Sequence, residues 1–208
     1  MTATSFELWA PFFVALAITA AVTPAAIWLA PKIGAMDIPK DDRRVHNKPM
    51  PRFGGIAIFI GIMISLSIFA VEDKGVLSAM LGCSLIYVLG LVDDLKNLKP
   101  AVKMGGQIIC AVAVYATGLK IEFITNYFGP GNMAFGDVTC FIITVLWLVA
   151  ITNAVNLIDG LDGLAAGISA ISALCIGYVA YIHGQYIPTL AMMIIAGGAL
   201  GFLPYNFH

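Results

Sequence analysis

Residues 138–164 read VTCFIITVLWLVAITNAVNLIDGLDGL, a long apolar run that ends in amides, carboxylates and glycines. The apolar part matches the roughly 20 residues that a helix needs to cross the hydrocarbon core of a bilayer. The run is continuously apolar, whereas a strand of a membrane barrel would alternate apolar and polar residues. The stretch therefore predicts a transmembrane helix whose polar end meets the membrane surface.

The rest of the chain repeats this pattern. Of its 208 residues, 60% are hydrophobic and only 11% are charged, and the formal net charge is −1. These values exclude an ordinary soluble domain and provide no field that would attract nucleic acid. The apolar blocks are Phe6–Leu29, Phe53–Val71, Val76–Val92, Met104–Leu119, Val138–Ile158, Leu164–Ile182 and Ile187–Leu203. We therefore predict an all-α polytopic membrane protein with about seven transmembrane helices, forming a single transmembrane domain over residues 1–208.

The basic residues predict the orientation of the helices. All 11 Lys and Arg residues except Lys74 and Lys120 fall in the connections at 30–52 and 93–103. Short cytoplasmic loops carry an excess of Lys and Arg. We therefore place the loops at 30–52, 93–103 and 153–163 in the cytoplasm and the N-terminus outside.

The connection at 119–137 lies on the external side in this topology. Residues 120–125, KIEFIT, alternate polar and apolar side chains, and Gly129–Pro130–Gly131 follows as a turn signal. This pattern predicts a small external β-hairpin between the fourth and fifth helices.

Two adjacent carboxylates, Asp93 and Asp94, close the third apolar block, and Asn97 follows about one helical turn later. Adjacent like charges repel each other unless a cation lies beside them. Mg²⁺ prefers oxygen ligands and usually takes one or two carboxylates together with substrate phosphates. The cluster therefore predicts a metal site, and the alternative from these residues alone is a solvated helix end.

A second cluster closes the fifth block. Four polar residues recur at every third position, namely Asn153, Asn156, Asp159 and Asp162. That spacing keeps neighbours on one face of a helix, and Gly160 and Gly163 allow the backbone to break the helix and approach a ligand. Polar groups near bilayer depth are costly and usually functional. The alternative is an interhelical turn capped by Asp162, which would explain one polar residue and not four.

The first predicted cytoplasmic loop is basic. Its candidate anion-binding residues are Arg43, Arg44, His46, Lys48 and Arg52. Cations beside the N–H groups of a helix start bind phosphate well, and the alternative is anchoring to anionic lipid. Together the three clusters predict phosphoryl transfer between a water-soluble donor and a lipid acceptor at the cytoplasmic surface.

Three stretches carry a family resemblance: VHNKPMPRFGG at 45–55, LVDDLKN at 91–97 and NAVNLIDGLDGL at 153–164. They resemble the polyprenyl-phosphate N-acetylhexosamine-1-phosphate transferases, and most of all the undecaprenyl-phosphate N-acetylglucosamine-1-phosphate transferases of teichoic-acid and O-antigen (lipopolysaccharide) synthesis. The resemblance implies a Mg²⁺-dependent enzyme of the cell membrane, with Mn²⁺ as an alternative metal. It implies transfer of N-acetylglucosamine 1-phosphate from UDP-N-acetylglucosamine to undecaprenyl or another polyprenyl phosphate, with release of UMP. This reaction would be the first step in making a lipid-linked intermediate of the cell wall or a surface glycan.

The resemblance also implies roles for individual residues. The catalytic residues would be Asp93, Asp94, Asp159 and Asp162, and the metal ligands would be Asp93, Asp94 and Asn156. As substrate-binding residues we predict Arg43, Arg44, His46, Lys48, Arg52, Asn97, Asn153, Asn156 and Gly160, of which the resemblance maps Asn156 to the nucleotide side of the site. Whether one Asp deprotonates the lipid phosphate or acts as a nucleophile in a two-step route stays open.

Members of this family are longer and continue past the segment that matches 201–208. We therefore expect this chain to be the N-terminal part of a longer transferase, and to be inactive or weakly active alone. The alternatives are a phospho-N-acetylmuramoyl-pentapeptide-transferase type of activity, a transporter or channel, and a non-catalytic membrane scaffold. The expected partners are UDP-N-acetylhexosamine, a polyprenyl phosphate and the membrane, without nucleic acid, and a homodimer is left open.

Overall fold

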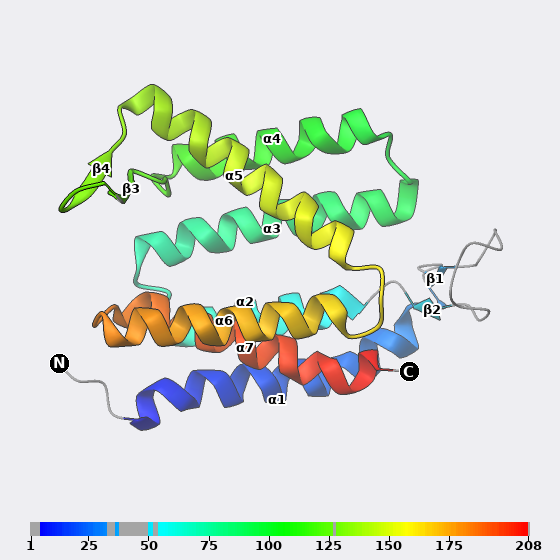
Figure 1. Cartoon of the computed structure of the whole chain (residues 1–208). Helices are drawn as coiled ribbons and strands as arrows, with labels where there is room; N and C mark the ends of the chain where they lie inside the picture. The colour runs from blue at the N-terminus through cyan, green and yellow to red at the C-terminus, as the bar shows by residue number, and fades with distance from the viewer. Residues whose placement is uncertain (1–4, 33–35, 38–49, 52–53, 127, 208) are drawn as a thin grey trace. The chain divides into compact units, whose positions relative to one another are not determined.

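The computed structural model describes residues 5–32, 36–37, 50–51, 54–126 and 128–207. Within these residues the helices are α1 (Ser5–Leu29), α2 (Gly54–Phe69), α3 (Lys74–Lys96), α4 (Pro100–Ala116), α5 (Asp137–Ile158), α6 (Leu164–Ile182) and α7 (Tyr186–Asn206). The strands are β1 (Met36–Asp37), β2 (Met50–Pro51), β3 (Phe123–Thr125) and β4 (Asn132–Ala134). Figure 1 shows these elements along the chain.

The predicted fold class is confirmed, because every predicted apolar block corresponds to a helix in the described residues. The helices α1, α3, α5, α6 and α7 are long and apolar enough to cross a membrane, whereas α2 and α4 are shorter apolar helices of 16 and 17 residues. At a rise of about 1.5 Å per residue, a helix of that length falls short of a hydrocarbon core of about 30 Å. The protein is a multi-pass membrane protein.

The chain divides into two compact units, and the first contains residues 1–73 and 159–208. In this unit, glycines of α7 allow close approach of α1. A methyl group on Gly197 would overlap the backbone of Phe12, and one on Gly201 would overlap the backbone of Leu16. Small residues at helix contacts are a common way to pack helices in a membrane, where the hydrophobic effect does not drive association. Close backbone packing therefore holds α1 against α7.

The second unit contains residues 74–158 and is built from α3, α4 and α5 (Figure 1). The helix α4 contacts both neighbours. Gly82 of α3 lies against the side chain of Val114, and the rings of Tyr115 on α4 and Phe141 on α5 meet edge to face at 5.2 Å. Consecutive helices joined by short connections run antiparallel, so the end of α3, the start of α4 and the end of α5 meet at one end of this unit.

The predicted hairpin is present between α4 and α5. Strands β3 and β4 pair antiparallel, with Ile124 opposite Met133. The backbone N–H of Ile121 donates to Thr144 Oγ1 at 2.9 Å, which ties the start of the hairpin to α5. The short pairing of β1 with β2, in which Met36 lies opposite Pro51, was not predicted.

Two predicted loops are shorter than expected. The loop predicted over 93–103 is mostly helical, because α3 continues to Lys96 and α4 begins at Pro100. A proline suits the first turn of a helix, since the missing N–H has no partner there in any case. The loop predicted over 153–163 is likewise reduced to residues 159–163, so Asn153 and Asn156 lie on α5. The polar residues were predicted to lie in loops, whereas α3, α4 and α5 each extend beyond their apolar part.

Candidate active-site residues

Asp93 lies in the last turn of α3 and binds groups from the connection and from α4. Its Oδ1 accepts a hydrogen bond from the backbone N–H of Leu98 at 3.1 Å. Its Oδ2 lies 2.8 Å from Lys103 Nζ. The backbone turns sharply just before Leu98, because Asn97 adopts a positive φ of 47°. A carboxylate that accepts from a backbone N–H and an ammonium is held in one orientation.

Lys103, in the first turns of α4, connects two of the predicted site residues. Besides Asp93, its ammonium group donates to Asn156 Oδ1 on α5 at 3.0 Å. The side chains of Lys103 and Asp93 retain only 25% and 20% of their exposed area. Partial burial reduces screening by solvent, so this pair contributes more than an exposed surface pair would. Asp93 and Asn156, which are 63 positions apart in the sequence, therefore share one cation.

A second polar contact joins α4 to α5 next to the first. Asn153 Nδ2 donates to Gln107 Oε1 at 2.7 Å, and Gln107 Nε2 donates to Asn153 Oδ1 at 3.4 Å. Gln107 is 2% exposed. We name the four side chains of Lys103, Gln107, Asn153 and Asn156 the α4–α5 polar ladder. Each rung pairs one residue of α4 with one residue of α5.

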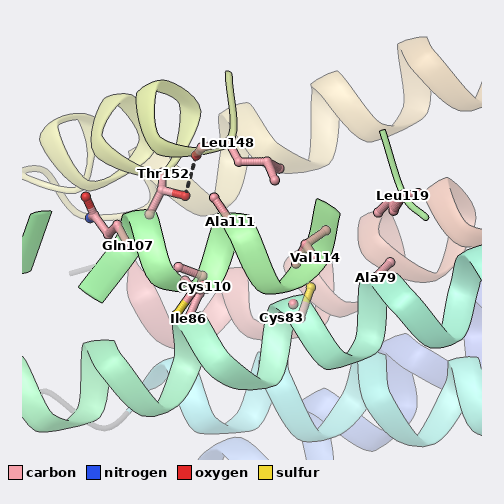
Figure 2. Close-up of a pocket in the computed structure, with 11 residues that line it drawn as sticks. Ala79, Cys83, Ile86, Gln107, Cys110, Ala111, Val114, Leu119, Leu148 and Thr152 are labelled. Atoms are coloured by element: carbon pink, nitrogen blue, oxygen red, sulfur yellow. Dashed lines mark hydrogen bonds between the residues drawn. The ribbon is translucent and has the colours of Figure 1, made fainter. Parts of the chain in front are cut away.

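An apolar cavity of about 250 Å³ lies between α3, α4 and α5 (Figure 2). Its walls are mainly small and aliphatic side chains, with Gln107 and Thr152 among them. Thr152 Oγ1 donates to Leu148 O within its own helix at 2.7 Å, so its hydroxyl is satisfied without crossing to α4. Gln107 meets its hydrogen-bonding needs across the helix contact instead.

The remaining predicted residues of this unit lie beside the ladder. Asp94 follows Asp93 on α3 and is exposed, as is Asn97 at the end of that helix. The structure therefore brings Asp93, Asp94, Asn97, Asn153 and Asn156 to one end of the second unit, as the sequence predicts.

Asp159, Gly160 and Asp162 belong to the first unit, in the turn that precedes α6. The alternative in which Asp162 is the N-cap residue of α6 is wrong. The N-cap residue is Gly163, which has a positive φ of 72° and makes no side-chain capping bond. Gly163 also lies against the ring of Phe207. Asp159 keeps an exposed surface, and partial desolvation by the surrounding chain raises the pKa of its carboxyl group.

The predicted anion-binding residues Arg43, Arg44, His46, Lys48 and Arg52 lie outside the described residues. Their role stays a prediction.

The predicted metal ligands have suitable chemistry, since carboxylate and amide oxygens are what Mg²⁺ binds. No group of three or more His, Cys, Asp or Glu side chains gathers within the described residues. Asp93 and Asn156 lie close together through their shared contact with Lys103, and an ion that takes one or two carboxylates and completes its shell with water and substrate phosphates fits these residues.

Lys103 and Gln107 were missed as candidate site residues. Lys103 was counted only for its charge, and Gln107 stands as a single amide in the apolar run KMGGQIICAV. The signal was their spacing, because residues four apart lie on one face of a helix. An amide one turn from a lysine at the start of an apolar helix predicts a polar contact with a neighbouring helix.

The sequence of this chain is similar to those of known proteins. The pattern of Glycosyl transferase family 4 matches residues 76–208. The chain is 41% identical over 203 residues to a probable undecaprenyl-phosphate N-acetylglucosaminyl 1-phosphate transferase of Bacillus subtilis, covering 95% of this chain and 55% of that protein. It is 34% identical over 198 residues to a decaprenyl-phosphate N-acetylglucosaminephosphotransferase of Mycolicibacterium smegmatis, covering 86% of this chain and 48% of that protein.

A phospho-N-acetylmuramoyl-pentapeptide-transferase of Moorella thermoacetica is 32% identical over 222 residues, with 97% of this chain and 68% of that protein covered. The chain thus spans about half the length of the first two relatives and two thirds of the third. The matched residues include all of α3 to α7 except the first two residues of α3. The chain belongs to glycosyl transferase family 4.

Proposed function

We propose that the protein transfers N-acetylglucosamine 1-phosphate from UDP-N-acetylglucosamine to a polyprenyl phosphate in the plasma membrane. The relatives named for N-acetylglucosamine transfer are 41% and 34% identical, and the muramoyl-pentapeptide relative is 32% identical. The observation that carries the proposal is the group formed by Asp93, Lys103 and Asn156 where three membrane helices end together. A charged group at that place can meet a lipid phosphate and a soluble nucleotide.

The reaction exchanges one pyrophosphate bond for another. A phosphate oxygen of the lipid attacks the phosphorus that carries the sugar, the bond between that phosphorus and the bridging oxygen of the donor diphosphate breaks, and UMP leaves with the bridging oxygen. Both substrates are anions, so catalysis consists mainly of positioning them and offsetting negative charge. The ammonium of Lys103 supplies positive charge, and Asp93 holds that ammonium in place.

Mg²⁺ is the proposed cofactor, with Mn²⁺ as an alternative. Asp93, Asp94 and the amide oxygen of Asn156 are the residues that would hold it, and the ammonium of Lys103, which contacts Asp93 and Asn156 in this structure, would have to give way to the ion there. When bound, the ion would neutralise phosphate oxygens of the donor. The carboxylates also serve the acceptor, since a carboxylate beside the lipid phosphate can take up its remaining proton before attack.

The site is proposed to face the cytoplasm. Lys96 at the end of α3, Lys99 in the connection and Lys103 near the start of α4 gather at one end of α4, whereas the connection at its other end carries Lys120 as its single Lys or Arg residue. This bias follows the positive-inside rule. It supports a cytoplasmic position for the Asp93 end of the second unit, where nucleotide sugars are available.

The test replaces Asp94 by Asn in the full-length protein, which removes a charge with little change in shape. Membranes containing the variant are supplied with radiolabelled UDP-N-acetylglucosamine and undecaprenyl phosphate, and lipid-linked radioactivity is extracted into butanol. We expect transfer to fall at least 100-fold, a loss of about 2.7 kcal/mol of transition-state stabilisation. The variant should insert into membranes as the unchanged protein does.

The matched control is Asp137→Asn, because Asp137 lies in the first turn of α5 at the hairpin end of the same unit. It should leave transfer unchanged. Normal turnover by Asp94→Asn would refute the site assignment. Labelling with UDP-N-acetylmuramoyl-pentapeptide and not with UDP-N-acetylglucosamine would replace the proposed donor by that of the Moorella thermoacetica relative.

A further inference from the structure

We infer that Gln107 and Asn153 are positioning residues: their mutual amide contact sets the register of α4 against α5 and so brings Lys103 to Asp93 and Asn156. The consequence for catalysis rests on the proposed function, whereas the register itself does not. Asn153 then serves inside the protein and not as a substrate-binding residue.

The hydrogen-bonding capacity of Asn153 is taken up within the protein. Its Nδ2 donates to Gln107 Oε1 at 2.7 Å and to Val149 O at 2.8 Å, which uses both N–H groups of the amide. Its Oδ1 accepts from Gln107 Nε2. A substrate acceptor could bind the N–H groups of Asn153 only by displacing one of these partners, and the Gln107 amide is almost fully buried.

The apolar surroundings make this contact costly to break. Gln107 forms part of the wall of the apolar cavity, where Figure 2 shows it at one end of the labelled lining residues. A buried amide without a partner costs free energy, because its hydrogen bonds to water are lost and not replaced. The two amides therefore favour the single arrangement in which each satisfies the other.

The spacing of the ladder shows why that arrangement sets the position of Lys103. Gln107 follows Lys103 by four residues on α4, and Asn153 precedes Asn156 by three residues on α5, so antiparallel helices align both rungs together. A slip of α4 by one turn would bring Lys103 to Asn153. Lysine has donors and no acceptor, so it cannot replace the mutual contact of two amides. Only one register satisfies every member of the ladder.

The test measures how readily Lys103 reacts with a trace of acetic anhydride, by mass spectrometry of the protein in detergent. The neighbouring Lys99 provides an internal reference, because it is exposed and lies outside the ladder. In Gln107→Leu and Asn153→Leu we expect the labelling ratio of Lys103 to Lys99 to rise at least threefold, since the amine spends less time on its two oxygen partners. The exchange Gln107→Asn with Asn153→Gln should restore the original ratio.

Two further variants separate the amide contact from other effects of the substitutions. Thr152→Val is the matched control, since it removes a hydroxyl from the same cavity wall whose bond stays within α5. It should leave the ratio unchanged. The double variant Gln107→Leu with Asn153→Leu leaves no unpaired amide and should fold even where the single variants do not. We expect Lys103 to label faster in it as well.

An unchanged ratio in the double variant would show that apolar packing sets the register, and the inference would then be wrong. The same holds if the exchanged pair labels like the single leucine variants. A raised ratio in a protein that shows no sugar-phosphate transfer would support the register and refute the proposed function. The two ideas therefore fail separately.

Discussion

A lysine lies beside a carboxylate near the start of α4 and another in the connection after its end, and these two pairs differ in what they join. At one end, Lys103 on α4 meets Asp93 on α3 at 2.8 Å and also Asn156 on α5. At the other end, Lys120 meets Glu122 at 3.2 Å, only two residues away along the chain. The side chain of Glu122 retains 59% of its exposed area, against 20% for Asp93.

This difference separates a pair that organises a site from one that does not. The Lys103 contact joins three helices and reaches Asn156, which lies 53 positions further along the chain, so it can hold functional groups in place. The Lys120 contact follows from local chain geometry, and exposed ion pairs contribute about 0–1 kcal/mol in general. The presence of an ion pair is therefore weak evidence for function, whereas its sequence separation and burial are strong evidence.

Among the changes that test this comparison, the largest effect is expected for Lys103→Met, which keeps the length of the side chain and removes its charge. Asp93 and Asn156 then lose the cation that they share, and hydrogen bonds to charged groups contribute about 1.5–3 kcal/mol. We expect the kcat/KM of sugar-phosphate transfer to fall at least tenfold, about 1.4 kcal/mol. Initial rates over a range of nucleotide-sugar concentrations measure it.

The control for this change is Lys99→Met, a similar loss of charge in the connection before α4. It should alter transfer less than twofold. Equal losses of activity in the two variants would mean that activity depends on the net charge at the start of α4 and not on the Lys103 contacts. The distinction between the Lys103 and Lys120 pairs would then be wrong.

The sequence predicted the elements of this site better than their contacts. Helices, the hairpin and the polar residues Asp93 and Asn156 follow from runs of apolar residues and from spacing, which are local properties. The partner of Asp93 does not, because a contact between α3 and α4 depends on how each helix is rotated about its axis. Lys103 was assigned to a loop since the apolar block begins at Met104, whereas the helix already begins at Pro100.

The pairing of β1 with β2 illustrates the same limit. Its two strands have two residues each, and the pairing of Met36 with Pro51 joins positions with no alternating pattern between them. The hairpin at β3 and β4 was predictable because glycines and a proline mark its turn. A turn can be predicted from its own residues. A pairing between more distant residues can be recognised only once the fold is known.

A smaller effect is expected for Thr144→Val at the hairpin end. Thr144 is 3% exposed, and its hydroxyl accepts the hydrogen bond from the backbone N–H of Ile121. Valine has nearly the same shape and leaves that N–H without its partner, which costs about 1 kcal/mol. We expect faster deuterium exchange at the amides of Phe123–Thr125, measured by mass spectrometry of the protein in detergent.

Transfer activity should stay normal in Thr144→Val, because the change lies at the end of α5 opposite the ladder. Thr152→Val serves as the control for the exchange measurement, since its hydroxyl bonds within its own helix. Slower transfer in Thr144→Val would show that the two ends of the unit are coupled.

The smallest effect is expected for Glu122→Gln, which breaks the exposed pair. Glu122 raises the pKa of Lys120, first through its side-chain hydrogen bond and then through its charge. Without the carboxylate that pKa should move down toward the ordinary value of lysine, which nitrogen NMR of labelled lysine side chains can follow as pH is raised. Because the pair is exposed and local, neither the melting temperature nor transfer should change. A clear drop in either would mean that the Lys120 pair also organises structure, and burial and sequence separation would then not distinguish the two ends of α4.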